Sequence, residues 1–157
     1  MERFRVVESS EGIEGAILRR LSARGRGAEI RVSEQHPALL VVSPGAAAKR
    51  IPLSGACRTV LLPGNAGELL DGLRAASAVS YGPSPKDSLT ISSREGDRLW
   101  VALQRELVTV DGQVVERQEF PLTLDHGAGA MPALAAAGAL LLLGVPPEEL
   151  SRQIPAQ

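Results

Sequence analysis

Apolar residues recur at helical spacing from Ile13 to Leu21, with arginines on the opposite side of the segment. This spacing predicts an amphipathic helix, because positions three and four apart share one face of a helix. A short apolar strand, residues 4–7, precedes it, and a second, residues 28–32, follows it. The chain therefore begins with a predicted strand–helix–strand order.

Two further runs are apolar without alternation: residues 38–42 (ALLVV) and residues 59–62 (TVLL). Continuous apolar runs of this length are typical of strands buried on both faces. Residues 66–76 carry leucines on one face and predict a helix, and residues 78–81 predict another strand. Strands alternating with helices favour an α/β fold with a mostly parallel sheet.

The pattern changes after residue 88. Residues 89–93, 99–107 and 114–122 have the composition of strands and are separated by short polar turns. These segments predict an antiparallel meander. We therefore expect a single domain over residues 1–157: an α/β fold, three-layer and Rossmann-like, whose mostly parallel sheet carries an appended antiparallel meander.

The dipeptide Asp111-Gly112 predicts a two-residue hairpin turn, because both central residues of such a turn adopt positive φ. In that register Glu106 lies opposite Arg117, a favourable cross-strand charge pair. Residues 104–106 are polar where a buried strand would be apolar. We expect an internal polar network centred on Glu106 and Arg117, or alternatively a polar binding surface.

Residues 131–143 form the longest apolar run, followed by Gly144 as a helix end and by Pro146-Pro147 as the start of a short helix. A membrane-spanning helix needs about 20 apolar residues, so this run is too short and we expect no membrane insertion. It predicts a helix that is apolar nearly all round. Its surplus apolar surface is either buried under neighbouring helices or used for a homodimer or protein partner through residues 131–144.

Composition narrows the possible partners. The chain has 44% hydrophobic and 22% charged residues, a net charge of -1 and 3% aromatic residues, so neither electrostatics nor base stacking favours nucleic-acid binding. Cys57 is the single cysteine, and no secretory signal begins the chain, so we expect a cytoplasmic protein without an internal disulfide. We interpret Cys57 as a small apolar residue that starts a strand. Two histidines without ligand spacing predict no metal and no cofactor.

Polar side chains gather at the end of a predicted central strand, in the segment YGPSPKDS. Tyr81, Ser84, Lys86 and Asp87 belong to it, and Asn65 follows the neighbouring strand. Open α/β sheets bind ligands beyond the carboxyl ends of their strands, which makes these residues candidate ligand contacts. The alternative is a rigid turn between prolines in which Asp87 caps its own backbone.

The segment FPLTLDHGAGAMPALAAAGALLLLGVPPEELSRQI, preceded by TVLLPGNAGELLDGLRAASAVSYGPSPKD, resembles the end of the central domain of the Mur ligase family. These are ATP-dependent amide ligases of peptidoglycan precursor synthesis in bacteria. In that family an antiparallel stretch leads to a Gly-His-Asn-x-x-Asn motif, an Ala-rich helix and a Leu-Gly-Val/Ile-x-x-Glu-x-Ile segment. The resemblance covers residues 59–154 and implies that they have the fold of this part of the Mur ligase central domain.

The chain departs from the family where ATP would bind. A phosphate loop needs Gly-Lys followed by Thr or Ser, and residues 43–50 (SPGAAAKR) do not provide it. The two Asn positions of the His-Asn-x-x-Asn motif are Gly127 and Ala130 here, and Asn65 alone matches the adenine-side segment. No catalytic residue is recognisable, and ligase activity is not expected.

Three functions remain open. The first is a non-catalytic accessory or binding module, a bacterial pseudoenzyme related to Mur ligases and associated with cell-wall precursor synthesis. The second is a small enzyme with its site at the strand edge that carries Asn65, Tyr81, Lys86 and Asp87. The third is a self-associating structural domain. The cell-wall link rests on resemblance of fold, which does not by itself determine function.

Overall fold

The computed structural model describes residues 2–23, 30–32, 37–125 and 127–152. Its strands are β1 (Glu2–Val7), β2 (Ile30–Val32), β3 (Leu39–Val42), β4 (Ala56–Pro63), β5 (Arg74–Tyr81), β6 (Leu89–Glu95), β7 (Arg98–Leu103), β8 (Leu107–Val108), β9 (Val114–Val115) and β10 (Gln118–Thr123). Its helices are α1 (Ile13–Ala23), α2 (Pro44–Ala48), α3 (Ala130–Leu142), α4 (Pro147–Leu150) and the 3-10 helix η2 (Gly67–Gly72).

One mixed sheet runs through the described part of the chain, in the order β10-β7-β6-β5-β4-β3-β1-β2. The strands from β2 to β5 are parallel, and β6 joins β5 in the same direction through the single pair Tyr81 and Leu89. β7 and β10 then continue the sheet antiparallel to their neighbours, while β8 and β9 form a separate hairpin. The predicted α/β fold with a mostly parallel sheet and an antiparallel meander is confirmed.

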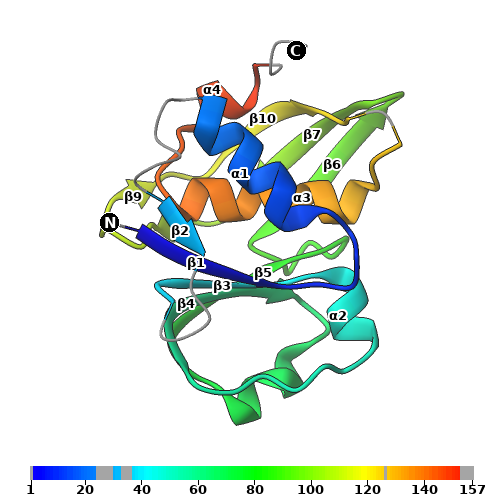
Figure 1. The fold of residues 1–157 in the computed structure, drawn as a ribbon. Helices are drawn as coiled ribbons and strands as arrows, with labels where there is room; N and C mark the ends of the chain where they lie inside the picture. The colour runs from blue at the N-terminus through cyan, green and yellow to red at the C-terminus, as the bar shows by residue number, and fades with distance from the viewer. Residues whose placement is uncertain (1, 24–29, 33–36, 126, 153–157) are drawn as a thin grey trace.

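Helices cover the sheet in layers (Figure 1). α1 and α3 lie on one face, over the larger hydrophobic core, and α2 and η2 lie on the other. β3 shows why its sequence is continuously apolar: Leu39 and Val41 enter the larger core, and Leu40 and Val42 enter the smaller one. A strand with both faces covered cannot alternate apolar and polar residues.

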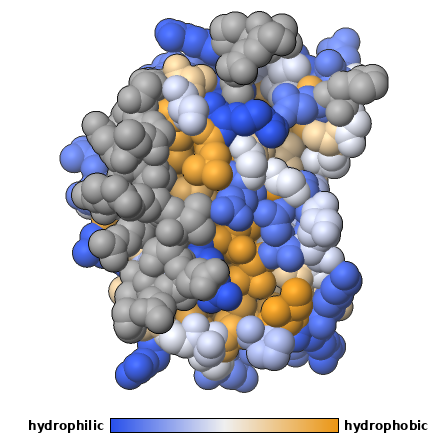
Figure 2. All heavy atoms as spheres, viewed as in Figure 1, coloured by the Kyte–Doolittle hydropathy of each residue, from blue (hydrophilic) through white to orange (hydrophobic). Residues whose placement is uncertain are grey.

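The smaller core is less completely covered. Buried residues such as Val60 and Leu62 of β4 are packed against side chains that stay partly exposed, including Ile51, Leu69 and Leu73. Figure 2 shows hydrophobic atoms at the surface between hydrophilic ones in the lower half of the view, where β3, β4 and α2 lie. This side of the sheet therefore borders on solvent.

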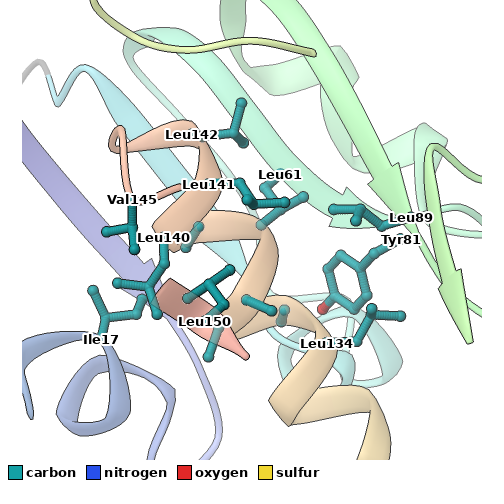
Figure 3. Close-up of a cluster of buried hydrophobic side chains, with 14 of the residues drawn as sticks. Ile17, Leu61, Tyr81, Leu89, Leu134, Leu140, Leu141, Leu142, Val145 and Leu150 are labelled. Carbon is teal, nitrogen blue, oxygen red and sulfur yellow. The ribbon is translucent and has the colours of Figure 1, made fainter. Parts of the chain in front are cut away.

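α3 is buried nearly all round. Residues 134–142 are all buried, against the sheet on one side and α1 on the other (Figure 3). Gly138 permits the close approach, because a Cβ there would lie 2.8 Å from Leu89 Cδ1. The surplus apolar surface predicted for this helix is thus covered within the chain. Association through residues 131–144 stays a prediction, and residues 130–133 are the partly exposed section of α3 available for it.

The end of α3 has the geometry of a Schellman motif. Gly144 takes a φ of +99° and donates its N–H to the Leu141 carbonyl, and Val145 donates to the Leu140 carbonyl. These two bonds satisfy carbonyls that the helix itself leaves unpaired. Val145 and Leu140 are both buried, in the apolar contact that accompanies this motif (Figure 3). The predicted helix end at Gly144 is confirmed.

The helix predicted over residues 66–76 is wrong. A single 3-10 segment, η2, occupies Gly67–Gly72, and β5 begins at Arg74. Pairing with β4 explains the difference, because Ala56 faces Arg74 and Cys57 faces Ala75 along the sheet. Strand pairing with β4 therefore includes residues that the leucine spacing had assigned to a helix. As a result, η2 has room for only one or two turns.

The long strands predicted over residues 99–107 and 114–122 are each divided in two. β7 ends at Leu103, and the β8–β9 hairpin places Leu107 opposite Val115 and Val108 opposite Val114. This register is one residue away from the predicted one, because the connecting turn bonds Thr109 N–H to the Gln113 carbonyl rather than closing tightly around Asp-Gly.

The predicted buried pair of Glu106 and Arg117 is therefore wrong. Both side chains are exposed, they are not partners in the hairpin, and no ion pair joins them in the described part of the chain. The physical reason is that the chain leaves the sheet after Leu103 and re-enters it only at Gln118, so neither charge is carried into the core.

Other predictions agree with the structure where it describes the chain. α1 covers the predicted amphipathic helix, and its buried residues are Ile13, Ile17 and Leu21. Residues 28–29 of the predicted second strand lie outside the described residues. Among the described helices, none is both long and apolar enough to cross a bilayer.

Candidate functional site

The five candidate residues line one cavity. Its volume is about 660 Å³, and it lies beyond the carboxyl ends of β4 and β5. The candidates contribute Asn65 from the turn after β4 and Tyr81, Ser84, Lys86 and Asp87 from the end of β5 and the loop that follows. The rest of the lining includes residues of α2, Arg50 two residues after its end, and Met131 of α3. The sequence-based grouping of these residues is therefore reproduced in space.

Asp87 organises the loop between β5 and β6. Its Oδ2 accepts a hydrogen bond from Ser84 N–H at 3.1 Å, and its own N–H donates to the Ser84 carbonyl at 3.0 Å. The interpretation of this segment as a capped turn is thus correct. The carboxylate also lies against two glycines: a Cβ on Gly64 would overlap Oδ1, and one on Gly82 would lie 2.6 Å from Oδ2.

The second oxygen of Asp87 has no hydrogen-bond donor among the described residues. The residue is 4% exposed, and it lines the cavity. Oδ1 has no described partner but is not fully buried, so it retains contact with solvent. This oxygen is therefore an acceptor of a nearly buried residue, and no described residue donates to it.

Two neighbouring side chains brace this loop from outside. Gln104 Nε2 donates to the Pro85 carbonyl at 2.9 Å and to the Asp87 carbonyl at 3.0 Å, and Arg105 donates to the Lys86 carbonyl at 2.7 Å. Of the polar residues 104–106, Gln104 and Arg105 make these contacts, and their bonds go to backbone carbonyls of the loop rather than to Arg117.

Tyr81 is committed to the scaffold. Its hydroxyl donates to the Val42 carbonyl at 2.6 Å, which ties the end of β5 to the end of β3, and the side chain is fully buried. Figure 3 shows its ring lying among the apolar side chains of the core. Burial, with a smaller contribution from the Glu11 carboxylate, raises the pKa of Tyr81. The hydroxyl therefore stays protonated and fixes the edge of the cavity to the end of β3.

Lys86 and Asn65 are the uncommitted polar side chains of the cavity. Both are exposed, and neither side chain has a hydrogen bond or an ion pair with the described residues. Arg50 is engaged with Glu68 at 3.6 Å, in an exposed ion pair of the kind that contributes little stability. Lys86 is thus the free cation of this cavity, and Asn65 is its free amide.

Helix α1 carries an internal anion at its amino terminus. Glu8, in the loop after β1, accepts the N–H of Ile13 at 2.8 Å through Oε1 and the N–H of Glu14 at 3.0 Å through Oε2. These are the amide groups that the first helical turn leaves unpaired. A helix that follows a strand is a common site for phosphate, and here a carboxylate of the chain itself occupies it.

A second carboxylate occupies the start of α2. Glu11 accepts hydrogen bonds from the Ser43 hydroxyl, from Gly45 N–H at 2.9 Å and from Ser9 N–H at 3.0 Å. Burial acts to raise the pKa of Glu11, but these bonds, joined by the charge of Lys49, outweigh it and lower the pKa overall. Both helix starts at this edge of the sheet are therefore already neutralised.

A smaller cavity of about 340 Å³ lies between α1 and the start of α3. Apolar side chains such as Ala136 and Leu140 form its inner wall, and an exposed ion pair, Arg19 with Asp125 at 3.3 Å, lies beside it. Arg20, which also lines this cavity, donates to the carbonyls of Glu149, Leu150 and Arg152 and thereby caps α4. His126, which begins the altered family motif, lies outside the described residues.

Cys57 is not activated as a nucleophile, and the described acidic residues do not gather into a metal site. Cys57 is the second residue of β4, where burial raises the pKa of its thiol and so disfavours the reactive thiolate. In the part of the chain that the structure describes, no three side chains of His, Cys, Asp or Glu gather as a metal site would require.

Comparison with solved structures identifies the scaffold. The chain shares its fold with part of the Mur ligases. The crystal structure of MurF from Acinetobacter baumannii matches 99% of this chain with a TM-score of 0.57 at 12% sequence identity. A murein peptide ligase from Psychrobacter arcticus matches 95% of it with a TM-score of 0.54 at 8% identity.

The chain spans 46% of each of these two Mur ligases. The similarity reaches beyond residues 59–154 and includes the amino-terminal residues, in which the sequence shows no family pattern. No protein-family model and no curated protein matches the sequence. At this identity the similarity to Mur ligases shows the fold alone.

Several residues that shape the site were not predicted. Glu8 and Glu11 were not recognised as helix caps, because Glu8 binds an amide group 5 residues later in the chain and Glu11 binds one 34 residues later. One signal was present in the sequence: Ser43-Pro44 is a helix-start pair, with Ser as cap and Pro in the first turn. Gln104 carries no sequence signal for its role, since its partners lie 17 and 19 residues away.

Proposed function

We propose that this chain is a non-catalytic binding module built on the Mur-ligase scaffold, with its ligand site in the cavity beyond β4 and β5. The observation that carries the proposal is the occupation of both helix starts by Glu8 and Glu11. Nucleotide phosphates bind where helix amides are free and the local charge is positive. Two internal carboxylates at these positions oppose the binding of a nucleotide phosphate.

The cavity supports binding without catalysis. Pockets for small ligands measure about 300–1,000 Å³ and combine apolar walls with a few polar groups, and this cavity has that character. Its uncommitted groups are Asn65, Lys86 and one oxygen of Asp87. No described side chain acts on another as a base acts on a nucleophile in this cavity, so the groups recognise a ligand rather than transform it.

The proposed link to cell-wall precursor synthesis rests on the resemblance of fold to Mur ligases. A bacterial pseudoenzyme that keeps the scaffold of Mur ligases and loses their phosphate site is suited to act beside such enzymes, as an accessory protein. We include this context in the proposal, since it is the setting in which the scaffold is found.

Isothermal titration calorimetry and amide NMR test the binding role together. Titration with Mg-ATP, with ADP and with a UDP-linked muramyl precursor is followed through the amide signals of residues 64–66 and 84–88. We expect no nucleotide-dependent shift at the starts of α1 and α2 and no ATP hydrolysis. A small polar ligand shifts the cavity signals, and Asn65→Ala and Lys86→Ala reduce that response.

Arg94→Ala is the matched control, because Arg94 is an exposed cation on the distant β6–β7 hairpin. It should leave ligand binding unchanged. Hydrolysis of Mg-ATP by the purified chain would contradict the non-catalytic proposal. Failure of every ligand class, nucleotide, precursor, sugar and peptide, to shift the cavity signals would contradict the binding role itself.

A further inference from the structure

We propose that the cavity between α1 and the start of α3 binds a free carboxylic acid with a short saturated hydrocarbon chain. The hydrocarbon lies against the buried side chains of the cavity, and the carboxylate contacts Arg19. This cavity has a volume of about 340 Å³ and shares no described lining residue with the cavity beyond β4 and β5. The inference therefore concerns a second site and goes beyond the proposed function.

The cavity exists because α1 and α3, which pack against each other, present small residues to it. Gly12, just before α1, and Ala16 line it on one side, and Ala133, Ala136 and Ala137 of α3 line it on the other. Protein interiors are densely packed, and voids larger than a water molecule are few. A cavity of about 340 Å³ has instead the size of a pocket for a small ligand.

The buried part of the cavity is aliphatic. Every buried residue of its described lining is apolar, and the largest are Ile13, Leu122, Leu124, Leu140 and Leu150. Leu140 and Leu150 come from α3 and α4 and belong to the cluster drawn in Figure 3. Water is a poor occupant of such a space, because a buried water needs several polar partners. A hydrocarbon chain is favoured there, since it leaves water for aliphatic surroundings.

The lining also favours a saturated chain over a ring. No aromatic side chain is present in the described lining, so an aromatic ligand would find no ring to pack against. Alanine and leucine side chains contact a flexible chain equally well at any point along its length. The buried part of the cavity thus recognises length and apolar character.

The exposed part of the cavity carries cations. Arg19 donates from one guanidinium nitrogen to Asp125 Oδ2 at 3.3 Å, in an ion pair whose side chains are 60% and 74% exposed. The remaining N–H groups of Arg19 can bind the carboxylate of a ligand, the group that a guanidinium fits best. Arg19 is therefore the contact that we assign to the acid.

The charge near this contact is positive. Arg20 also lines the cavity, and its hydrogen bonds go to backbone carbonyls, which carry no net charge. Asp125 acts on the charge of Arg20 as well as on that of Arg19, so one carboxylate serves two guanidinium groups. Glu11 is part of the lining too, but it is bonded to Gly45 N–H and the Ser43 hydroxyl and lies near the charge of Lys49.

Calorimetric titration with octanoate tests the proposal against octanol, hexanoate and octylammonium. Octanol should bind about threefold to tenfold more weakly than octanoate, because an exposed contact with Arg19 contributes modestly. Hexanoate should bind about tenfold more weakly, because it buries fewer methylene groups. Octylammonium should bind more weakly than octanol, since its charge has the sign of Arg19 and Arg20.

Cavity-filling variants locate the hydrocarbon. Ala136→Leu places a larger side chain in the buried part of the cavity and should abolish the binding of both octanoate and octanol. Ala133→Leu, at a partly exposed position of the same lining, should do the same and serves if the first variant does not fold. Ala130→Leu is the matched control, because Ala130 lies on the same helix outside the described lining, and it should bind like the parent chain.

Charge variants locate the carboxylate. Arg19→Gln should weaken octanoate about threefold to tenfold and leave octanol unchanged. Asp125→Asn should strengthen octanoate, because it releases Arg19 from its ion pair, and should again leave octanol unchanged. Both effects should shrink at high salt, since the groups are exposed. Arg94→Gln, which removes an exposed cation outside the described lining, should have no effect.

Absence of octanoate binding at millimolar concentration overturns the proposal and leaves the proposed function of the other cavity untouched. Binding that survives in folded Ala136→Leu and Ala133→Leu places the ligand elsewhere and also overturns it. Octanol or octylammonium binding as tightly as octanoate overturns the assignment of an acid. Parallel changes of octanoate and octanol in Arg19→Gln would show that Arg19 affects the fold rather than the carboxylate, and would likewise contradict the assignment.

Discussion

The α-carbon of Gly64 and the carboxylate of Asp87 are in direct contact, and a Cβ at position 64 would overlap Asp87 Oδ1. Gly64 belongs to the turn after β4, and Asp87 to the loop after β5. Their contact therefore joins the two loops that form the cavity. It also explains why Asp87 is nearly buried although it lies in a loop at the edge of the sheet.

Replacing Gly64 with alanine should destabilise the protein by about 1–3 kcal/mol, because the added methyl group displaces the Asp87 carboxylate from its turn. Urea denaturation followed by circular dichroism measures the loss. Gly67→Ala is the matched control, since a Cβ there meets nothing within 4 Å. An equal stability of the Gly64 and Gly67 variants would show that the two loops are not in contact.

Removing the Gln104 amide should loosen the loop that carries Ser84, Lys86 and Asp87. Gln104→Ala leaves the carbonyls of Pro85 and Asp87 without their donor, at a cost of about 1–2 kcal/mol. Amide hydrogen exchange in residues 84–88 should accelerate. Gln118→Ala, which loses only a local bond to Glu116 on the surface, should change stability by less than about 0.5 kcal/mol.

The Glu11 carboxylate should stabilise the fold at neutral pH and lose this effect in acid. Its folded-state pKa is lowered, so its contribution is present above the unfolded-state pKa and disappears as the pH falls through the folded-state value. The stability difference between the parent and Glu11→Gln should therefore be largest near pH 7 and shrink below about pH 4.5. A difference that grows on acidification would refute this role. Glu95→Gln, at the exposed end of β6, serves as control.

Gly144 and Gly15 should respond to alanine in opposite directions. Gly144 has a φ of +99° at the end of α3, so Gly144→Ala costs about 1 kcal/mol through backbone strain. Gly15 lies inside α1 with ordinary contacts, and Gly15→Ala should stabilise by up to about 1 kcal/mol through helix propensity. Thermal denaturation of the two variants gives the comparison. Equal shifts would mean that position 144 does not require a left-handed residue.

The predicted elements that proved correct are those whose burial is visible in a local pattern. Leu39 to Val42 are apolar at every position, and such a run can exist only where both faces of a strand are covered. α1 shows the same agreement, because the apolar residues that recur at helical spacing are the buried ones. The predicted helix over residues 66–76 was wrong, because its leucines cover only the partly exposed smaller core. The strand pairing with β4 that replaces it acts across the sheet and produces no periodic pattern in the sequence.

In the candidate site, too, the sequence predicted some features and not others. Asn65, Ser84, Lys86 and Asp87 were found because strand ends in a parallel sheet converge at one edge. The roles of these residues were not determined by that rule. Tyr81 became part of the scaffold once Val42 lay within reach of its hydroxyl, and Gln104 became the brace of the loop because β7 ends beside it.

The sequence by itself determined the α/β class, the buried central strands and the capped apolar helix, since each follows from hydrophobic period and backbone chemistry within a few residues. The tertiary structure alone decided which polar groups are satisfied and which are free. Glu8 and Glu11 fill the helix starts, while one oxygen of Asp87 has no donor among the described residues. Hydrogen-bond partners are chosen by distance in space, and the fold brings together atoms that the chain holds far apart.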